Sequence, residues 1–167
     1  MPVTPFHFGP GLALKGLAPR SVSWTAFVAS NVVIDCESFY YLTRGKWPVH
    51  RTLHTFVGAA IVGVATAVVL LAIRTILRKR ASSIAIGPFV RAETSTRGIW
   101  IGAMCGALSH PVLDGIMHPD IEPFQPFSVS NPLHGLVALG PLHLGCALAG
   151  LVGVVLLLVR SRDRVTT

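Results

Sequence analysis

The chain has 167 residues, of which 51% are hydrophobic and only 13% are charged. Its mean hydropathy of +0.63 lies outside the range of soluble domains and indicates a membrane protein, with one domain over residues 1–167. The net charge of +7 does not indicate a nucleic-acid-binding protein, because the basic residues flank the apolar segments instead of forming one patch. We therefore expect membrane lipids, and no nucleic acid, around this chain.

Four apolar segments are long enough to cross a hydrocarbon core of about 30 Å, which takes about 20 helical residues. They lie near residues 22–42, 52–76, 98–117 and 134–159. A shorter segment, residues 8–18, precedes them, and "APR" at 18–20 is expected to form the turn behind it. The sequence predicts an all-α fold: a multi-pass membrane bundle of four spanning helices plus a short N-terminal re-entrant or interfacial helix.

The basic residues predict the orientation of this bundle. Of the 14 Lys and Arg residues, 11 precede the first segment, separate the second from the third or follow the fourth, and the other 3 separate the first from the second. Because positively charged loops stay in the cytoplasm, both termini and the basic tail at 160–167 are expected inside. The loops 43–51 and 118–133 then face outward.

Ionisable residues that topology does not explain gather at the outer level of the bundle. They are Asp35 and Glu37 late in the first segment, His50, Arg51 and His54 at the start of the second, His110, Asp114, His118 and Asp120 at the end of the third, and His134 at the start of the fourth. Each costs about 2.5–3.5 kcal/mol on membrane insertion scales, so residues of this kind are functional candidates by default. Their convergence predicts a ligand that they share.

Imidazoles combined with carboxylates are the ligands of zinc and similar divalent ions. His50 and His54, and likewise His110 and Asp114, are spaced i,i+4, so each pair is expected to project from one helical face. Asp35 is favoured over Glu37 as a direct ligand, because two residues so close on a regular helix cannot both face the centre. Since the candidates exceed the needs of one ion, a site with two or more metals is expected.

His7 needs a separate argument, because it begins on the cytoplasmic side. If residues 8–18 form a re-entrant helix, a rise of about 20 Å over thirteen residues brings His7 nearly to the depth of Asp35. At the other end of the set, Pro119 is expected to stop the third helix near His118. That leaves His118 and Asp120 at the edge of the site.

Each candidate also has a structural interpretation. His110 and Asp114 would then be a hydrogen-bonded pair that holds helices together, and His50, Arg51 and His54 would anchor the chain at the membrane interface. His118, Asp120 and Glu122 would be charged loop residues in water. His134 would be a residue at the start of a helix, and His143 would be a core histidine near Pro141. His7 in a cytoplasmic tail would have no part in the site. These interpretations stay open at the level of the sequence.

The ordered set "FHFGPGLALKG", "NVVIDCES", "HRTLHTFVGA" and "GALSHPVLDGIMHPD" resembles the YdjM-like family of bacterial inner-membrane, metal-dependent hydrolases. The resemblance covers residues 6–127 and implies a bacterial cytoplasmic membrane. That family is in turn similar to the zinc-dependent phospholipase C and single-strand nuclease superfamily. The implied ligands, in the superfamily's order, are His7, Asp35, His50 or His54, His110 with Asp114, His118 and His134. Two features depart from it: no histidine follows "DCE", and no acidic residue follows His134 at helical spacing.

The resemblance implies a membrane-bound hydrolase that cleaves a phosphoester, with a lipid among the candidate substrates, at the outer side of the membrane. The cofactor implied is a divalent metal, zinc before others. Arg51 would hold the phosphate, and Asp120 or Glu37 would orient a ligand imidazole or act as a general base. A metal- or proton-translocating protein is the alternative, but it needs ligands on both halves of the membrane. A non-catalytic scaffold with a structural metal is a further alternative.

Overall fold

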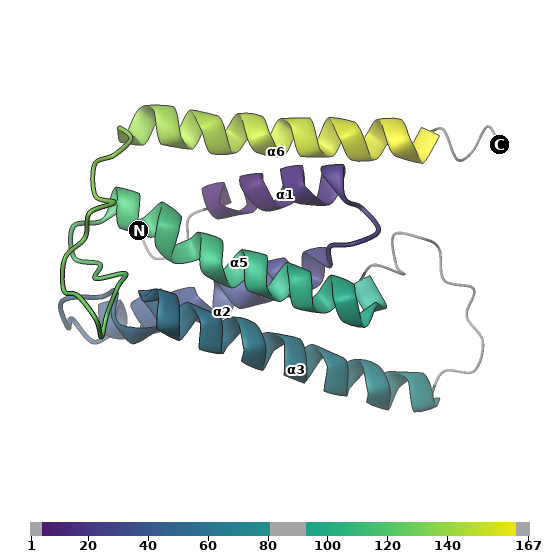
Figure 1. Ribbon diagram of the computed structural model, residues 1–167, viewed down its shortest axis with the longest axis horizontal. Helices are drawn as coiled ribbons and strands as arrows, with labels where there is room; N and C mark the ends of the chain where they lie inside the picture. Colours follow the sequence, from purple (N-terminus) through teal and green to yellow (C-terminus); the bar gives the residue numbers. More distant parts are fainter. Residues whose placement is uncertain (1–4, 81–92, 163–167) are drawn as a thin grey trace.

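The computed structural model describes residues 5–80 and 93–162, and within these ranges its regular elements are all helices (Figure 1). In chain order they are the 3₁₀ turn η1 (Pro5–His7), α1 (Phe8–Leu17), α2 (Trp24–Thr43), the 3₁₀ turn η2 (Thr52–His54), α3 (Phe56–Arg80), α5 (Thr96–Met117) and α6 (Leu139–Arg162). The expected all-α bundle with a short N-terminal helix is confirmed. Residues 81–92 and 163–167, which include the last part of the basic tail, lie outside the described residues.

Local sequence signals explain where two of these helices begin and where one of them ends. Ser23 caps α2 by accepting a hydrogen bond from the backbone N–H of Ala26 at 3.2 Å, and Ser95 caps α5 by accepting one from Gly98 at 2.8 Å. Helix α5 ends at Met117, just ahead of Pro119, which has no N–H to continue it. The expected stop near His118 is therefore confirmed.

Three helices of the described chain are long and apolar enough to cross a membrane: Phe56–Leu77, Thr96–Met117 and Leu139–Ser161. Helix α2 also has 20 residues but falls outside this set. It carries two carboxylates and a buried polar face, which includes Ser30, Asn31 and Ser38. Length and composition thus support three spans, where the sequence predicts four.

Two of the expected span boundaries are wrong. Helix α3 starts at Phe56 and not at 52, because the Glu37 carboxylate accepts hydrogen bonds from the backbone N–H groups of Arg51 and Leu53 and holds them outside the helix. Helix α6 starts at Leu139 and not at 134. The preceding residues turn back onto the end of α5, where Asn131 Nδ2 donates to the carbonyl of Gly115 at 2.9 Å.

Helix α5 is the centre of the bundle and packs against both α2 and α3, whereas α1 lies along α6 (Figure 1). Glycines allow the close approach of α1 and α6. A Cβ atom on Gly9 would lie 2.0 Å from the carbonyl oxygen of Cys146, and one on Gly153 would lie 2.3 Å from the carbonyl of Leu12. Helix α1 has only 10 residues, so it starts part of the way along the bundle. The turn η1 before it therefore contacts α5, and its His7 lies beside Asp114.

A buried ion pair fixes the turn between α1 and α2. Lys15 is only 1% exposed, and its Nζ donates to Glu93 Oε1 and to the carbonyl of Val22, both at 2.7 Å. Glu93 also accepts from the Ser23 hydroxyl and from the backbone of Trp24. Burial raises the pKa of Glu93, but the hydrogen bonds from Lys15 and these neighbours outweigh it, so the pKa lies below its ordinary value. Lys15 is therefore not simply a charge flanking a span, as the topology argument counts it.

Candidate metal centre

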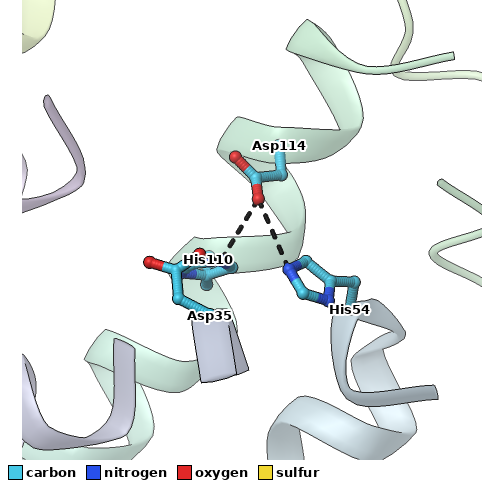
Figure 2. A group of neighbouring side chains, drawn as sticks. All are labelled: Asp35, His54, His110 and Asp114. Atoms are coloured by element: carbon cyan, nitrogen blue, oxygen red, sulfur yellow. Dashed lines mark ion pairs between the residues drawn. The ribbon is translucent and has the colours of Figure 1, made fainter. Parts of the chain in front are cut away.

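Three elements bring two histidines and two carboxylates together in the interior (Figure 2). Asp35 comes from α2, His54 from η2, and His110 and Asp114 from α5, where they are one turn apart. One ligand atom from each lies within 4.8 Å of the others, and all four residues are buried. We call these four residues the inner group.

The nitrogen and oxygen atoms of the inner group face one another. His110 Nε2 lies 3.1 Å from Asp114 Oδ2 and 3.4 Å from Asp35 Oδ1, and His54 Nε2 lies 3.7 Å from the same Asp114 oxygen. His110 Nε2 is nevertheless a buried atom that makes no hydrogen bond of normal geometry. Buried polar atoms normally find such a partner. An unsatisfied imidazole nitrogen that faces two carboxylates fits a site for a cation between them.

A second group shares one of these carboxylates. His50, Asp114 and His118 also offer ligand atoms within 4.8 Å of one another, and we call them the outer group. The rings of His50 and His118 stack with their centres 4.5 Å apart. Burial lowers the pKa of both histidines, and the neighbouring His54 lowers that of His50 further. Both shifts favour the neutral imidazole, which is the form that binds metals.

Three histidines are oriented through Nδ1 by acceptors from outside the two groups. His54 Nδ1 lies 3.2 Å from Glu37 Oε2, and His50 Nδ1 lies 3.0 Å from Asp120 Oδ2. His110 Nδ1 lies 3.0 Å from Asn31 Oδ1. With the Nδ1 proton donated to these acceptors, the lone pair of each ring is on Nε2. Metal-binding histidines are commonly oriented in this way.

Asn31 is the residue of this set that the sequence reasoning missed. It precedes Asp35 by four residues, so both lie on the same face of α2, and Asn31 is 1% exposed. Its Nδ2 donates to the carbonyl of Phe27 at 2.9 Å, which fixes Oδ1 as the acceptor for His110. The i,i+4 spacing to Asp35 is the signal in the sequence that points to Asn31.

The expectation that His50 and His54 project from one helical face is wrong. Helix α3 begins after both residues: His50 lies in the loop and His54 in η2. Their rings still lie close together, with centres 4.8 Å apart. Hydrogen bonds from the loop to Glu37 produce the proximity that was attributed to helical periodicity.

His7, the last residue of η1, contacts Asp114 and His110. Its Nε2 lies 2.9 Å from Asp114 Oδ1, and its ring stacks on that of His110 with centres 4.4 Å apart. His134 is exposed and belongs to neither group, since α6 starts only at Leu139. His143 stacks on Phe6 with ring centres 4.2 Å apart and belongs to neither group. The structure thus brings together the proposed histidine ligands except His134.

Arg51 lies in a polar pocket of about 320 Å³ beside the outer group. The pocket lining includes His50, Arg51, Thr55, Asp120, Glu122 and Gln125. Arg51 Nε donates to the carbonyl of Pro48 at 2.9 Å, and its guanidinium carbon lies 3.9 Å from the ring centre of Tyr41. Among the residues that the structure describes, no hydrogen bond or ion pair engages the two terminal nitrogens of Arg51. They form a fixed cationic fork of the kind that binds oxyanions.

Comparison with known proteins assigns the family. No curated protein and no solved structure matches the chain. The sequence profile of the family described as YdjM inner membrane protein matches residues 7–166. That range includes every member of the inner and outer groups and all the candidate spans. The chain therefore belongs to the YdjM family of inner membrane proteins.

Proposed function

We propose that this protein is a membrane-bound, metal-dependent hydrolase that cleaves a phosphoester at the outer side of the membrane. The observation that carries the proposal is the position of Asp114, which belongs to both the inner and the outer group. A carboxylate has two oxygens and can bridge two cations. Two ions on either side of a shared carboxylate are a common arrangement in phosphoester hydrolases.

The donor set fits zinc. In the inner group Asp35, His54, His110 and Asp114 would hold one ion, and in the outer group His50, Asp114 and His118 would hold another. The lowered pKa of His50 and of His118 agrees with the same assignment, because the neutral imidazole is the metal-binding form. When bound, such ions supply a water of lowered pKa and polarise the phosphoryl oxygen.

Residues around the two groups would bind the phosphate of the substrate and orient the histidine rings. Arg51 would hold the phosphate with its two terminal nitrogens, next to the outer group. Glu37 and Asp120 each accept the Nδ1 proton of a histidine, so we assign them to positioning these rings and not to acting as the general base. Held this way, the Nε2 atoms of His54 and His50 are kept unprotonated.

We further propose that α2 crosses the membrane as a fourth span, with both termini in the cytoplasm. Twenty helical residues rise about 30 Å, which is enough to cross. The polar side of α2 is covered by α5, while Val32, Val33 and Phe39 are exposed on its other side and would meet lipid. Reporter fusions after Lys46 and after Thr167 test this: the first should report outside and the second inside.

Metal content tests the site. Purified protein should hold two zinc ions per chain, Asp114→Asn should lose both, and His118→Ala should lose only the ion of the outer group. Asn is close in shape to Asp, so the first variant is expected to fold. Full zinc content in Asp114→Asn contradicts the shared site. His134→Ala is the control and should keep both ions, because His134 lies outside both groups.

Turnover tests the activity. The protein should hydrolyse bis(p-nitrophenyl) phosphate, a soluble phosphodiester, and lose that activity on chelation and regain it with zinc. Arg51→Gln should raise KM more than it lowers kcat, because Arg51 is assigned to binding. Zinc uptake into sealed vesicles, with no turnover of any phosphoester, would point to translocation instead and would overturn the hydrolase.

A further inference from the structure

The hydroxyl of Ser38 lies against the inner group, although Ser38 is not one of its four members. Ser38 belongs to α2 and is fully buried. Its Oγ atom lies 3.1 Å from His54 Nε2, the ring atom that faces Asp114. Because His54 Nδ1 lies against the Glu37 carboxylate, the lone pair on Nε2 accepts this hydrogen bond from the hydroxyl. Ser38 is therefore bonded to the atom by which His54 would bind a metal.

Ser38 does not make the hydrogen bond that is usual for a serine in a helix. Such a hydroxyl commonly donates to a backbone carbonyl three or four residues earlier. Serines and threonines elsewhere in the described helices do so, namely Ser30, Thr43, Thr75, Ser109 and Ser161. The hydroxyl of Ser38 has the His54 ring as its partner instead, so it is directed at the inner group.

The position of Ser38 along α2 agrees with this direction. Asn31, Asp35 and Ser38 are spaced by four and then three residues, so they lie on one face of the helix. All three are buried. Asn31 orients the ring of His110, and Asp35 belongs to the inner group. Ser38 is thus the third polar residue that this face of α2 turns toward the candidate metal centre.

The distance between Ser38 Oγ and His54 Nε2 is that of two neighbouring ligands on one ion. Donor atoms that bind an ion at about 2.0–2.2 Å, with octahedral or tetrahedral angles, lie about 2.8–3.6 Å from each other. The 3.1 Å between Ser38 and His54 falls in this range. So do the 3.1 and 3.4 Å from His110 Nε2 to the carboxylates of Asp114 and Asp35. A hydroxyl that bound only a water on the ion would lie farther out.

We infer that Ser38 is a further ligand of the inner ion, to which its hydroxyl oxygen adds a fifth donor atom. This inference rests on the proposed function, because it concerns the ion that the inner group would hold. When His54 Nε2 binds that ion, its lone pair no longer accepts the hydroxyl proton. Ser38 then turns its oxygen to the same ion and donates the proton to a carbonyl of α2, the usual partner of a helical serine. Two nitrogens and three oxygens surround the ion.

Ser38, His54 and Glu37 follow one another in the order of the triad of serine hydrolases, whose hydroxyl attacks the substrate. A nucleophile has to be reached by the substrate. The Ser38 side chain is fully buried, and it is not part of the lining of the Arg51 pocket. The geometry therefore favours a metal ligand over a nucleophile at this position.

Cobalt substitution tests the inference without relying on catalysis. Co²⁺ occupies sites of imidazole and carboxylate ligands, and a cysteine thiolate bound to it adds a charge-transfer band in the near ultraviolet. Cysteine is close in shape to serine, so the full-length Ser38→Cys protein, loaded with Co²⁺ in detergent, should gain this band. Ser30→Cys is the matched control and should not gain it, because the Ser30 hydroxyl bonds within its own helix. The unaltered protein should lack the band although it contains Cys36, Cys105 and Cys146.

Ser38→Ala provides a second measurement and decides the question if Ser38→Cys fails to fold. Removal of the fifth donor leaves a four-coordinate ion, so the visible absorption of bound Co²⁺ should rise several-fold toward that of a tetrahedral site. His118→Ala is used as the background, because it should hold only the inner ion. Ser30→Ala should leave the spectrum unchanged. A visible spectrum that is the same with and without the Ser38 hydroxyl overturns the inference, even where turnover falls.

The inference and the proposed function fail in different ways. If the unaltered chain binds neither Co²⁺ nor zinc, the metal-dependent hydrolase is contradicted, and the fifth ligand with it. If it binds two ions per chain but Ser38→Cys gives no near-ultraviolet band, only the role of Ser38 is contradicted. Zinc-dependent turnover of bis(p-nitrophenyl) phosphate would then still support the hydrolase.

Discussion

Glu37 Oε2 lies 3.2 Å from Nδ1 of His54, on the opposite side of the ring from Nε2, which faces Asp114. The same oxygen accepts hydrogen bonds from the backbone of Arg51 at 3.2 Å and of Leu53 at 3.0 Å. One carboxylate of α2 therefore fixes both the path of the loop before α3 and the direction of the His54 lone pair. This explains how a histidine outside any long helix is held against α5.

Removal of the Glu37 carboxylate should weaken metal binding without removing a direct ligand. We expect Glu37→Leu to lower zinc affinity by about 100-fold and Glu37→Gln by about 10-fold, since Gln keeps an acceptor but loses the charge. Competition with a chromogenic chelator measures both. Glu122→Gln is the control, because the Glu122 side chain accepts a hydrogen bond from Gln125 and Glu122 belongs to neither group. Equal affinities in Glu37→Leu and the unaltered chain would remove the positioning role.

Asn31 should matter to the inner group for the same reason. Asn31→Leu keeps the size of the side chain but takes the acceptor away from His110 Nδ1, so we expect zinc affinity to fall by about 10- to 100-fold. Ser30→Ala is the matched control on the same buried face of α2, because its hydroxyl bonds only to the carbonyl of Phe27. If the two variants bind zinc equally well, the Asn31–His110 contact is not needed for the site.

The sequence predicts the all-helical architecture and three of the apolar spans, because apolar length is a local property of the chain. It also identifies every member of the two groups, because ionisable residues in or beside long apolar segments are rare enough to stand out. The position of His50 and His54 was predicted for the wrong reason. Periodicity suggested a helix there, but Glu37 holds the loop by long-range hydrogen bonds that no local pattern reveals.

Other features were hidden because they depend on tertiary contacts. Lys15 has the sequence signature of a cytoplasmic flanking charge, and only the folding of α1 back onto the bundle brings it to Glu93, 78 residues later. The side chain of Asn31 is an uncharged amide, so the high cost of burying a charge does not single it out as a candidate site residue. His134 is expected at the start of a span, but residues 135–138 separate it from Leu139, where α6 begins. Span starts are thus the weakest part of the sequence prediction.

The Lys15–Glu93 pair should make stability depend on pH. The pKa of Glu93 is lowered on folding, so its contribution is fully present above its ordinary value of 4.5 and is lost as the pH falls through the lower, folded-state pKa. We expect the apparent Tm to fall more steeply below pH 4.5 in the unaltered protein than in Glu93→Gln, because Gln has no carboxylate that can be protonated. At pH 7, Glu93→Gln should cost about 3 kcal/mol, because Lys15 stays buried without an opposite charge. Parallel Tm curves for the two proteins would contradict this role.

The contact between α1 and α6 should be sensitive to a single methyl group. A Cβ on Gly153 would lie 2.3 Å from the backbone carbonyl of Leu12 and 2.5 Å from the backbone nitrogen of Ala13, and backbone atoms cannot rotate away. We expect Gly153→Ala to destabilise the protein by about 1–3 kcal/mol and to lower its apparent Tm.

Gly145→Ala is the matched control on the same helix, because a Cβ there meets nothing within 4 Å. It should be neutral or slightly stabilising, since alanine favours helix by about 0.5–1 kcal/mol over glycine. Displacement of α1 in Gly153→Ala should also move His7 away from Asp114, to which it is paired at 2.9 Å, so zinc affinity should fall together with the Tm. A normal Tm and normal zinc affinity in Gly153→Ala would mean that close packing of α1 against α6 is not needed to hold His7 at the site.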